Sequence, residues 1–282
     1  MKVPWKYYDY CHNPYLPIAS TKGKFSPNAL LNNSLLESSF SEQFILFIKV
    51  IIKAIGPWNT VWGVKLNRGV LTWELYFYNH QSKDSLKKVT SLLKVFSACF
   101  KVPDFRKINL ERMPYFMWSV DIDQNILKSR QMQGLHIYIP GRSDACQGNS
   151  YFCNDTGFVL ENHYDFFRLP RETYKFIDRV KHSIVLGSES SLFMKNDLVK
   201  RLMLCHEICF ANKRTQEGVY FSRINVDQLI YFLEWFAYPS FIVDFIKANK
   251  HRLNHLLYDV AFDCTIVSGK IKFGKSSYYG VF

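Results

Sequence analysis

The chain has 282 residues, of which 48% are hydrophobic and 17% aromatic, enough for one large domain with its own core. Its 36 basic residues exceed its 24 acidic ones, and the formal net charge of +12 favours an anionic partner. The seven cysteines show no even framework of spacings, and no apolar signal-peptide segment opens the chain. Composition thus argues against a disulfide-rich secreted protein, and we expect a cytoplasmic protein with reduced thiols.

Three kinds of anionic partner fit the charge: a phosphorylated small molecule, nucleic acid or a membrane surface. The basic residues are spread along the chain, and the densest runs, SKDSLKK and KANKHR, have the composition of solvated helix faces. Nucleic acid is therefore the less favoured partner. The apolar run FILFIKVIIKAIGPW is too short and contains too many lysines to cross a membrane, and it predicts a buried helix.

Residues 1–38 contain several prolines and no regular apolar period, which predicts an irregular N-terminal arm packed on the body. Residues 39–282 show no linker and are expected to form a single domain. The first element of that domain is a helix that begins near Ser41 and stops at Gly56.

Strand pairs and helices then alternate to the end of the chain, with turn sequences such as NRG and SG between paired strands. Asn225 is expected to cap one of the helices. The predicted strands are 58–66, 70–78, 115–123, 134–140, a short pair within 150–162, 207–213, 218–224, 259–267 and 270–282. The predicted helices are 82–100, 170–185, 190–204, 225–238 and 240–258.

This alternation of helices and two-stranded hairpins predicts the fold. Hairpins pair antiparallel, so the helices can all lie on one face of the sheet. About ten strands covered on one face predict an α/β (α+β) fold that closes into a barrel, with an outer ring of helices in ααββ repeats. Closure removes the exposed sheet edges, and a barrel of that size has a lumen that can hold a ligand.

Strict alternation assigns the side chains of each strand to two faces. In strand 70–78, Glu74 and Tyr76 share a polar face, and Trp73, Leu75 and Phe77 form an apolar face that is expected beneath the helices. Other strands carry further polar candidates, namely Lys65, Asp121, Asp123, Lys213, Tyr220, Arg223, Lys272 and Tyr278. A solvated face of an open sheet is the alternative explanation, but the many tyrosines favour a ligand-binding lumen.

The alternation of helices and hairpins, with lysines, tyrosines and a glutamate on successive strands, resembles that of the aromatic prenyltransferases of the antiparallel α/β barrel (PT-barrel) type. The strand pair NTVWGVKL…LTWELYFY is similar to one in the cyanobactin peptide prenyltransferases of that fold. The resemblance is architectural and covers roughly residues 40–282, without the N-terminal arm. It implies a transferase that moves a prenyl group from an allylic diphosphate to an aromatic or peptide acceptor inside the barrel.

The resemblance also implies roles for individual residues. In that family basic residues and tyrosines of the strands hold the diphosphate, and a strand carboxylate orients or deprotonates the acceptor. Glu74 would take the catalytic position, and the substrate-binding positions would fall to Lys65, Lys213, Arg223, Lys272, Tyr76, Tyr220 and Tyr278. The sequence SVDID departs from the family, in which a basic strand is expected, and it suggests that Asp121 and Asp123 hold a magnesium ion.

These residue types suit the chemistry. Lysine and arginine stabilise a diphosphate leaving group as its charge grows, and tyrosine hydroxyls donate hydrogen bonds without adding charge. Aromatic faces stabilise an allylic cation, and a closed lumen keeps water away from it. The alternative is a non-catalytic basic module that holds nucleic acid or a protein partner. Such a module would place its lysines outside, whereas an enzyme would bring Lys65, Lys213 and Lys272 together.

Overall fold

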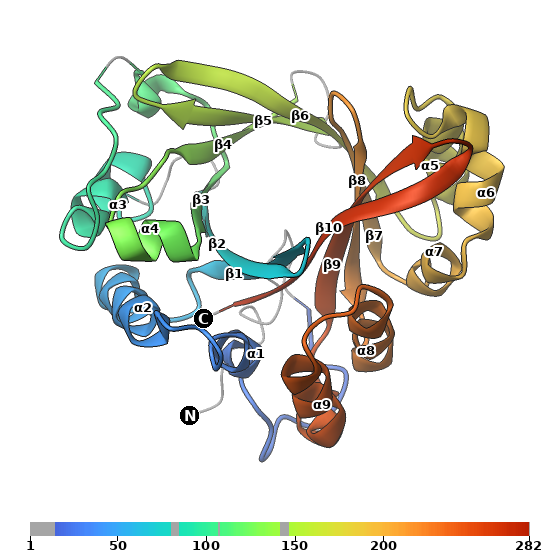
Figure 1. Cartoon of the computed structure of the whole chain (residues 1–282), viewed down its shortest axis with the longest axis horizontal. Helices are drawn as coiled ribbons and strands as arrows, with labels where there is room; N and C mark the ends of the chain where they lie inside the picture. The colour runs from blue at the N-terminus through green and yellow to red at the C-terminus, as the bar shows by residue number, and fades with distance from the viewer. Residues whose placement is uncertain (1–14, 80–84, 107, 142–146, 282) are drawn as a thin grey trace.

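The computed structural model describes residues 15–79, 85–106, 108–141 and 147–281, and within them ten strands form one closed antiparallel barrel (Figure 1). Each strand pairs with its neighbours in the chain, and β10 closes the ring by pairing with β1. The predicted barrel is confirmed. The strands are β1 Val61–Asn67, β2 Val70–Tyr78, β3 Met117–Ile122, β4 Leu135–Pro140, β5 Gln147–Asn154, β6 Gly157–Arg168, β7 Glu207–Asn212, β8 Glu217–Ile224, β9 Tyr258–Val267 and β10 Lys270–Val281.

The helices lie outside the barrel wall, and Figure 1 shows the labelled helices around the strands. None of the helices in the described ranges is long and apolar enough to cross a bilayer. The helices are α1 Asn28–Ser34, α2 Ser41–Ile55, α3 Val89–Phe96, α4 Gln124–Ser129, α5 Thr173–Lys181, α6 Ser190–Lys195, α7 Asp197–Leu202, α8 Val226–Trp235, α9 Ser240–Ala248 and α10 Lys250–Leu253, with 3₁₀ turns η3 Leu110–Arg112 and η4 Gly187–Glu189.

Short turns join four of the five strand pairs that are connected at one end of the barrel, and α4 joins the fifth pair, β3 and β4. Arg68 and Gly69 connect β1 to β2 with φ of 50° and 79°, and Ser268 and Gly269 connect β9 to β10 with φ of 52° and 69°. Two consecutive positive φ values are typical of the hairpin turn whose twist matches that of the flanking strands. Because the strands alternate in direction, the turns after β5 and β7 lie at this same end, which we call the hairpin end. We call the opposite end the helix end.

The outward faces of the strands and the helices form the hydrophobic core. Phe77 and Trp118 are fully buried there, and their rings stack with centroids 4.5 Å apart. Phe44 and Phe47 of α2 lie three residues apart on one helix face, and both are buried against this layer. Burial of each such side chain contributes about 2–3 kcal/mol, so this layer stabilises the barrel. The apolar face predicted for strand 70–78 is confirmed.

Two helix boundaries agree with the sequence signals. Helix α2 begins at Ser41 and ends at Gly56, whose φ of 81° is favoured by a residue without Cβ. Asn225 caps α8 through its side chain, and Gln228 returns a second hydrogen bond to complete a capping box.

Several segments differ from the prediction. Strands β5 and β6 extend beyond the short pair expected within 150–162, and the expected helix 240–258 is divided into α9 and α10 before β9 begins at Tyr258. Within the arm, of which residues 1–14 lie outside the described ranges, Asn28–Ser34 forms a helix, because Leu30 and Leu31 pack into the main core. The expected helix 82–100 is described as the shorter α3. The expected helix 190–204 is divided at Asn196, whose side chain accepts hydrogen bonds from two backbone N–H groups and starts α7.

Candidate functional site

The inward faces of the strands surround a cavity with two chambers. The polar chamber has a volume of about 430 Å³, and it lies toward the hairpin end. The apolar chamber, of about 110 Å³, lies toward the helix end. Charged side chains of the polar chamber are Lys65, Glu74, Asp121, His136, Glu161, Lys213, Arg214, Asp263 and Lys275. The apolar chamber is lined mainly by Val61, Tyr78, Phe116, Met117, Phe166 and Cys209, and Asn149, Glu207, Ser222 and Asp259 also border it.

A ring of five tyrosines lines both chambers at the level where they meet. Tyr76, Tyr138, Tyr164, Tyr220 and Tyr279 contact one another in sequence, with neighbouring ring centroids 5.9–6.4 Å apart, and Tyr279 returns to Tyr76. Burial raises the pKa of all five hydroxyls, so they remain neutral donors at physiological pH. We call this feature the tyrosine ring.

Gly63 of β1 leaves the space that the Tyr279 side chain occupies in the tyrosine ring. In the barrel register Gly63 lies opposite both Tyr279 and Glu74. A Cβ atom at position 63 would lie 2.8 Å from Cε1 of Tyr279, closer than side-chain atoms approach. Glycine therefore lets the Tyr279 ring lie across β1 toward the centre of the lumen.

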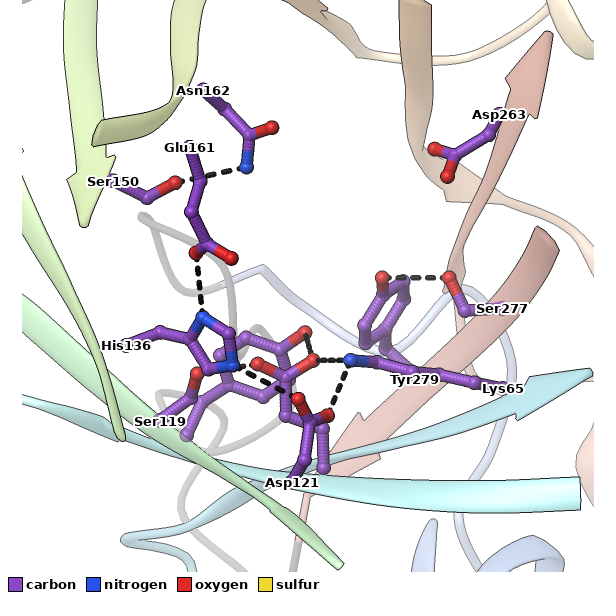
Figure 2. Close-up of polar contacts among 12 residues, drawn as sticks. Lys65, Ser119, Asp121, His136, Ser150, Glu161, Asn162, Asp263, Ser277 and Tyr279 are labelled. Carbon is purple, nitrogen blue, oxygen red and sulfur yellow. Dashed lines mark hydrogen bonds and ion pairs between the residues drawn. The ribbon is translucent and has the colours of Figure 1, made fainter. Parts of the chain in front are cut away.

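A chain of charged groups crosses the polar chamber beside the tyrosine ring (Figure 2). The Lys65 ammonium donates to Asp121 Oδ1 at 2.7 Å and also forms an ion pair with Glu74. His136 contacts Asp121 through Nε2 at 2.9 Å and Glu161 through Nδ1 at 2.7 Å. Residues from five strands thus meet through side chains that all point into the lumen.

The electrostatics of this network keep each member charged. Burial by itself would raise the pKa of Glu74, but the charges of Lys65 and His136 and the hydrogen bond from Lys65 together lower it. Burial likewise opposes the charge on Lys65, yet Asp121 and Glu74 raise its pKa. His136 is buried too, and its hydrogen bonds to Asp121 and Glu161 raise its pKa to about 10. At neutral pH the site therefore holds carboxylates beside an ammonium and an imidazolium.

Glu74 is the most enclosed carboxylate of the network, with 3% of its surface exposed. It accepts a hydrogen bond from the Tyr76 hydroxyl at 2.5 Å and another from Ser119. Its Oε1 also lies 3.4 Å from the hydroxyl of Tyr138. Glu74 is thereby fixed against the tyrosine ring, where a molecule bound in either chamber would meet it.

The polar chamber also holds a lysine without a direct counter-charge. Lys213 forms an ion pair with Asp263 at 2.6 Å, but Lys275 makes no hydrogen bond or ion pair within the described part of the chain. Lys65, then burial, then Lys213 lower the pKa of Lys275. Three ammonium groups that repel one another, one of them unpaired, form a site suited to an anion.

Six of the residues predicted from the sequence do meet in the lumen. They are Lys65, Glu74, Tyr76, Asp121, Lys213 and Tyr220. The predicted convergence of lysines holds for Lys65 and Lys213. The third lysine of the polar chamber is Lys275, because Lys272 is exposed on the part of β10 near the turn.

A β-bulge in β10 explains the difference at Tyr278. The register of β10 against β9 shifts between Phe273 and Ser276, which exchanges the two faces of the strand. Tyr278 consequently points outward, where its ring packs against Trp62 and Tyr238. Strict alternation assigned Tyr278 to the wrong face of the strand. Tyr279 is the residue of β10 that belongs to the tyrosine ring.

Arg223 and Asp123 are also placed away from the charged network. Arg223 lies beside a bulge in β8 with φ of 62°, its N–H donates to Asp259, and its guanidinium lies 5.6 Å from the Tyr15 ring. Asp123 caps α4 by accepting from the N–H of Ile126 at 2.7 Å. Both side chains have local roles that strand alternation does not reveal.

Several site residues were missed. His136 and Tyr138 alternate within LHIYIP, so extension of the polar face to that strand would have found them. Lys275 follows Gly274, and a glycine inside a strand is a recognised signal of a bulge. The parts played by Glu161, Tyr164 and Asp263 depend on the closed barrel and carry no local signal.

The polar chamber contains candidate ligands for the predicted magnesium ion. Glu74, Asp121 and His136 offer ligand atoms within 4.8 Å of one another. Magnesium prefers six oxygen ligands, however, and here both carboxylates contact the Lys65 ammonium while Asp121 also contacts a protonated histidine. Asp123 contributes nothing, because it caps α4. These residues do not fit a magnesium ion held by the protein alone.

Comparison with models of known protein families finds no match, and comparison with curated proteins also finds none. The function is therefore argued from the geometry and chemistry of the lumen.

Proposed function

We propose that the protein transfers a prenyl group from an allylic diphosphate to an aromatic or peptide acceptor inside the barrel. The observation that carries this proposal is the tyrosine ring, which separates a chamber with three lysines from an apolar chamber. A substrate with an anionic head and an apolar, cation-forming tail needs these two surroundings side by side.

The polar chamber supports binding of the diphosphate. Lys275 supplies an ammonium without a direct counter-charge, and Lys65 and Lys213 stand close enough to lower its pKa. A bound anion relieves this repulsion, and charge-assisted hydrogen bonds to phosphate oxygens are the strong kind. The proposal needs no metal from the protein itself.

Side chains of the lumen can assist each step of the transfer. The allylic C–O bond breaks, and the diphosphate leaves with the electron pair toward the lysines. The π faces of the tyrosine ring stabilise the allylic cation and exclude water. Electrons of the acceptor form the new bond, and the proton that the acceptor loses passes to the carboxylate of Glu74.

The described cysteines support the cytoplasm as the proposed location. Cys99, Cys153, Cys205, Cys209 and Cys264 are all free thiols. Thiols of this kind persist in a reducing compartment.

Glu74→Gln tests the catalytic role. We expect transfer to fall by about 10²–10⁴, the range for loss of a general base, because the amide cannot accept the proton. The matched control is Glu217→Gln, another buried glutamate on a strand, which hydrogen-bonds Ser183 on the outward side. Product formation from dimethylallyl or geranyl diphosphate and an aromatic peptide is the measurement; undiminished transfer by Glu74→Gln would remove Glu74 from the mechanism.

Lys275→Met tests the diphosphate site. We expect affinity for an allylic diphosphate to fall about tenfold or more, since one charge-assisted contact is lost. Lys272→Met, three residues away on the same strand but exposed, should bind as the wild type does. Calorimetry with and without magnesium makes the measurement, and equal losses in the two variants would point to an unspecific basic surface, the alternative function.

A further inference from the structure

Strand β6 has an open edge beside the mouth of the polar chamber. The strand runs from Gly157 to Arg168, but it pairs with β7 only from His163 onward. Residues 157–162 pair with β5 on one side, and no backbone hydrogen bond of the described residues reaches them on the other. We call this segment the β6 edge. Every second residue of such a segment presents its N–H and C=O to the vacant side.

The β6 edge is also unusually apolar for an exposed strand. Phe158, Val159 and Leu160 are 57%, 55% and 48% exposed. Consecutive strand residues point to opposite faces, so apolar side chains project on both sides of the same edge. Natural proteins normally protect such an edge with charge, proline or a covering element, because it pairs readily with another strand. Phe158, Val159 and Leu160 carry none of these devices, and the charge of Glu161 and the bulge that it forms against β5 lie at the inner end of the segment.

The position of the β6 edge connects it to the candidate site. Leu160, Glu161 and Asn162 line the polar chamber, and so do Arg214 and Gln216 from the turn that joins β7 to β8. Figure 2 shows Glu161 and Asn162 on one side of the lumen and Asp263 on the other. The β6 edge and the β7–β8 turn therefore both border the polar chamber.

We propose that the β6 edge binds an extended peptide segment by strand addition. A row of unused backbone donors and acceptors selects a ligand that carries the same groups at the same spacing, which is an extended peptide chain. Exposed Phe158 and Leu160 supply apolar contacts for alternate side chains of that peptide. The connection between this peptide and the acceptor rests on the proposed transfer. In that reaction, the added strand is the part of the acceptor peptide that flanks the acceptor residue, at the mouth of the polar chamber.

Strand addition is tested with a labelled synthetic peptide of alternating valine and threonine around one tyrosine. Binding is followed by fluorescence anisotropy without any prenyl donor, so the result is independent of transfer. Two further peptides carry backbone N-methyl groups on odd or on even residues. We expect one N-methyl series to bind at least about tenfold more weakly and the other to bind nearly as the parent does, because only one set of N–H groups faces β6.

Variants of the protein locate the binding. Phe158→Lys and Leu160→Lys should weaken peptide binding about tenfold, whereas Ile184→Lys should not, since Ile184 is 92% exposed but lies beyond α5. Glu74→Gln should bind the peptide normally even if it transfers nothing. No peptide binding, or equal binding of both N-methyl series, overturns the proposal. A wild-type dimer in sedimentation that Phe158→Lys dissociates also overturns it, because a second copy then occupies the edge.

Discussion

The outward and inward faces of the barrel wall have different roles. On the outward face of β2 and β3, Phe77 and Trp118 are fully buried in a continuous aromatic layer. One residue away on the same strands, Tyr76 and Ser119 point inward and hydrogen-bond Glu74 beside a cavity. The outward face gains stability from close packing, whereas the inward face keeps polar and charged groups around empty space.

This difference shows how a barrel can separate folding from chemistry. Because alternate residues face opposite sides, a substitution in the lumen leaves the helix-covered layer in place. The buried charges inside contribute little to net stability, since their desolvation offsets much of their attraction. A network of this kind is expected where a site must bind a charged ligand. Three predictions test the contrast between the outward and the inward face.

The largest expected effect is on the outward face. Phe77→Ala should lower the free energy of unfolding by about 3–5 kcal/mol, because it leaves a cavity against Trp118. The neighbouring inward change Tyr76→Phe should cost about 1 kcal/mol and weaken transfer instead, since it removes the hydrogen bond to Glu74. Urea unfolding and transfer assays compare the two variants; equal stability losses would contradict the separation of faces.

A smaller effect is expected from pH on the inward face. The pKa of His136 is raised to about 10 in the folded protein, above its usual value near 6.5, because Asp121 and Glu161 bind the charged form. This stabilisation is complete below about pH 6.5 and is lost as pH rises through about 10, so the free energy of unfolding should fall by about 2 kcal/mol across that window.

The control for this pH dependence is His136→Gln, which cannot titrate. Its unfolding free energy, measured in urea at the same pH values, should change less between neutral and alkaline pH than that of the wild type. Identical slopes for the two proteins would show that His136 is not held in its charged form.

The smallest effect on stability concerns neighbouring tyrosines of β10. Tyr278→Phe should cost about 1 kcal/mol at most and leave diphosphate and acceptor binding unchanged, because Tyr278 packs outward against Trp62. Tyr279→Phe should cost equally little but should alter transfer, because its hydroxyl bonds Ser277 at 2.7 Å within the lumen. Altered transfer in Tyr278→Phe alone would reverse the assignment of faces.

The sequence predicted the fold well because local signals repeat along the whole chain. Turn residues such as Gly69 and Gly269 marked hairpins, and Asn225 and Gly56 marked helix ends. Antiparallel hairpins then left few ways to hide their edges other than closure. The short helices were predicted less well, since Asp123 and Asn196 cap helices within segments that lack a strong apolar period.

The candidate site was predicted in part. Lys65 and Glu74 lie on regular strands, where alternation gives the correct face. Tyr278 and Arg223 lie beyond or within bulges, which local periodicity cannot follow, and Lys272 is exposed on the part of β10 near the turn. The ion pair between Lys213 and Asp263 and the contact of His136 with Glu161 each cross an intervening strand, so they depend on the curvature of the sheet and have no signal in the local sequence.

The bulge between Phe273 and Ser276 has a consequence for how such a lumen can evolve. Gly274 and Lys275 lie opposite Asp263 alone, so loss of one of them would restore regular pairing and leave residues 276–279 with their partners on β9. A residue can therefore be gained or lost at this point, and the lining of the lumen changed there, while the rest of the strand keeps its faces. Insertions and deletions in strands, and not point substitutions alone, are a route by which proteins of this architecture can acquire new ligands.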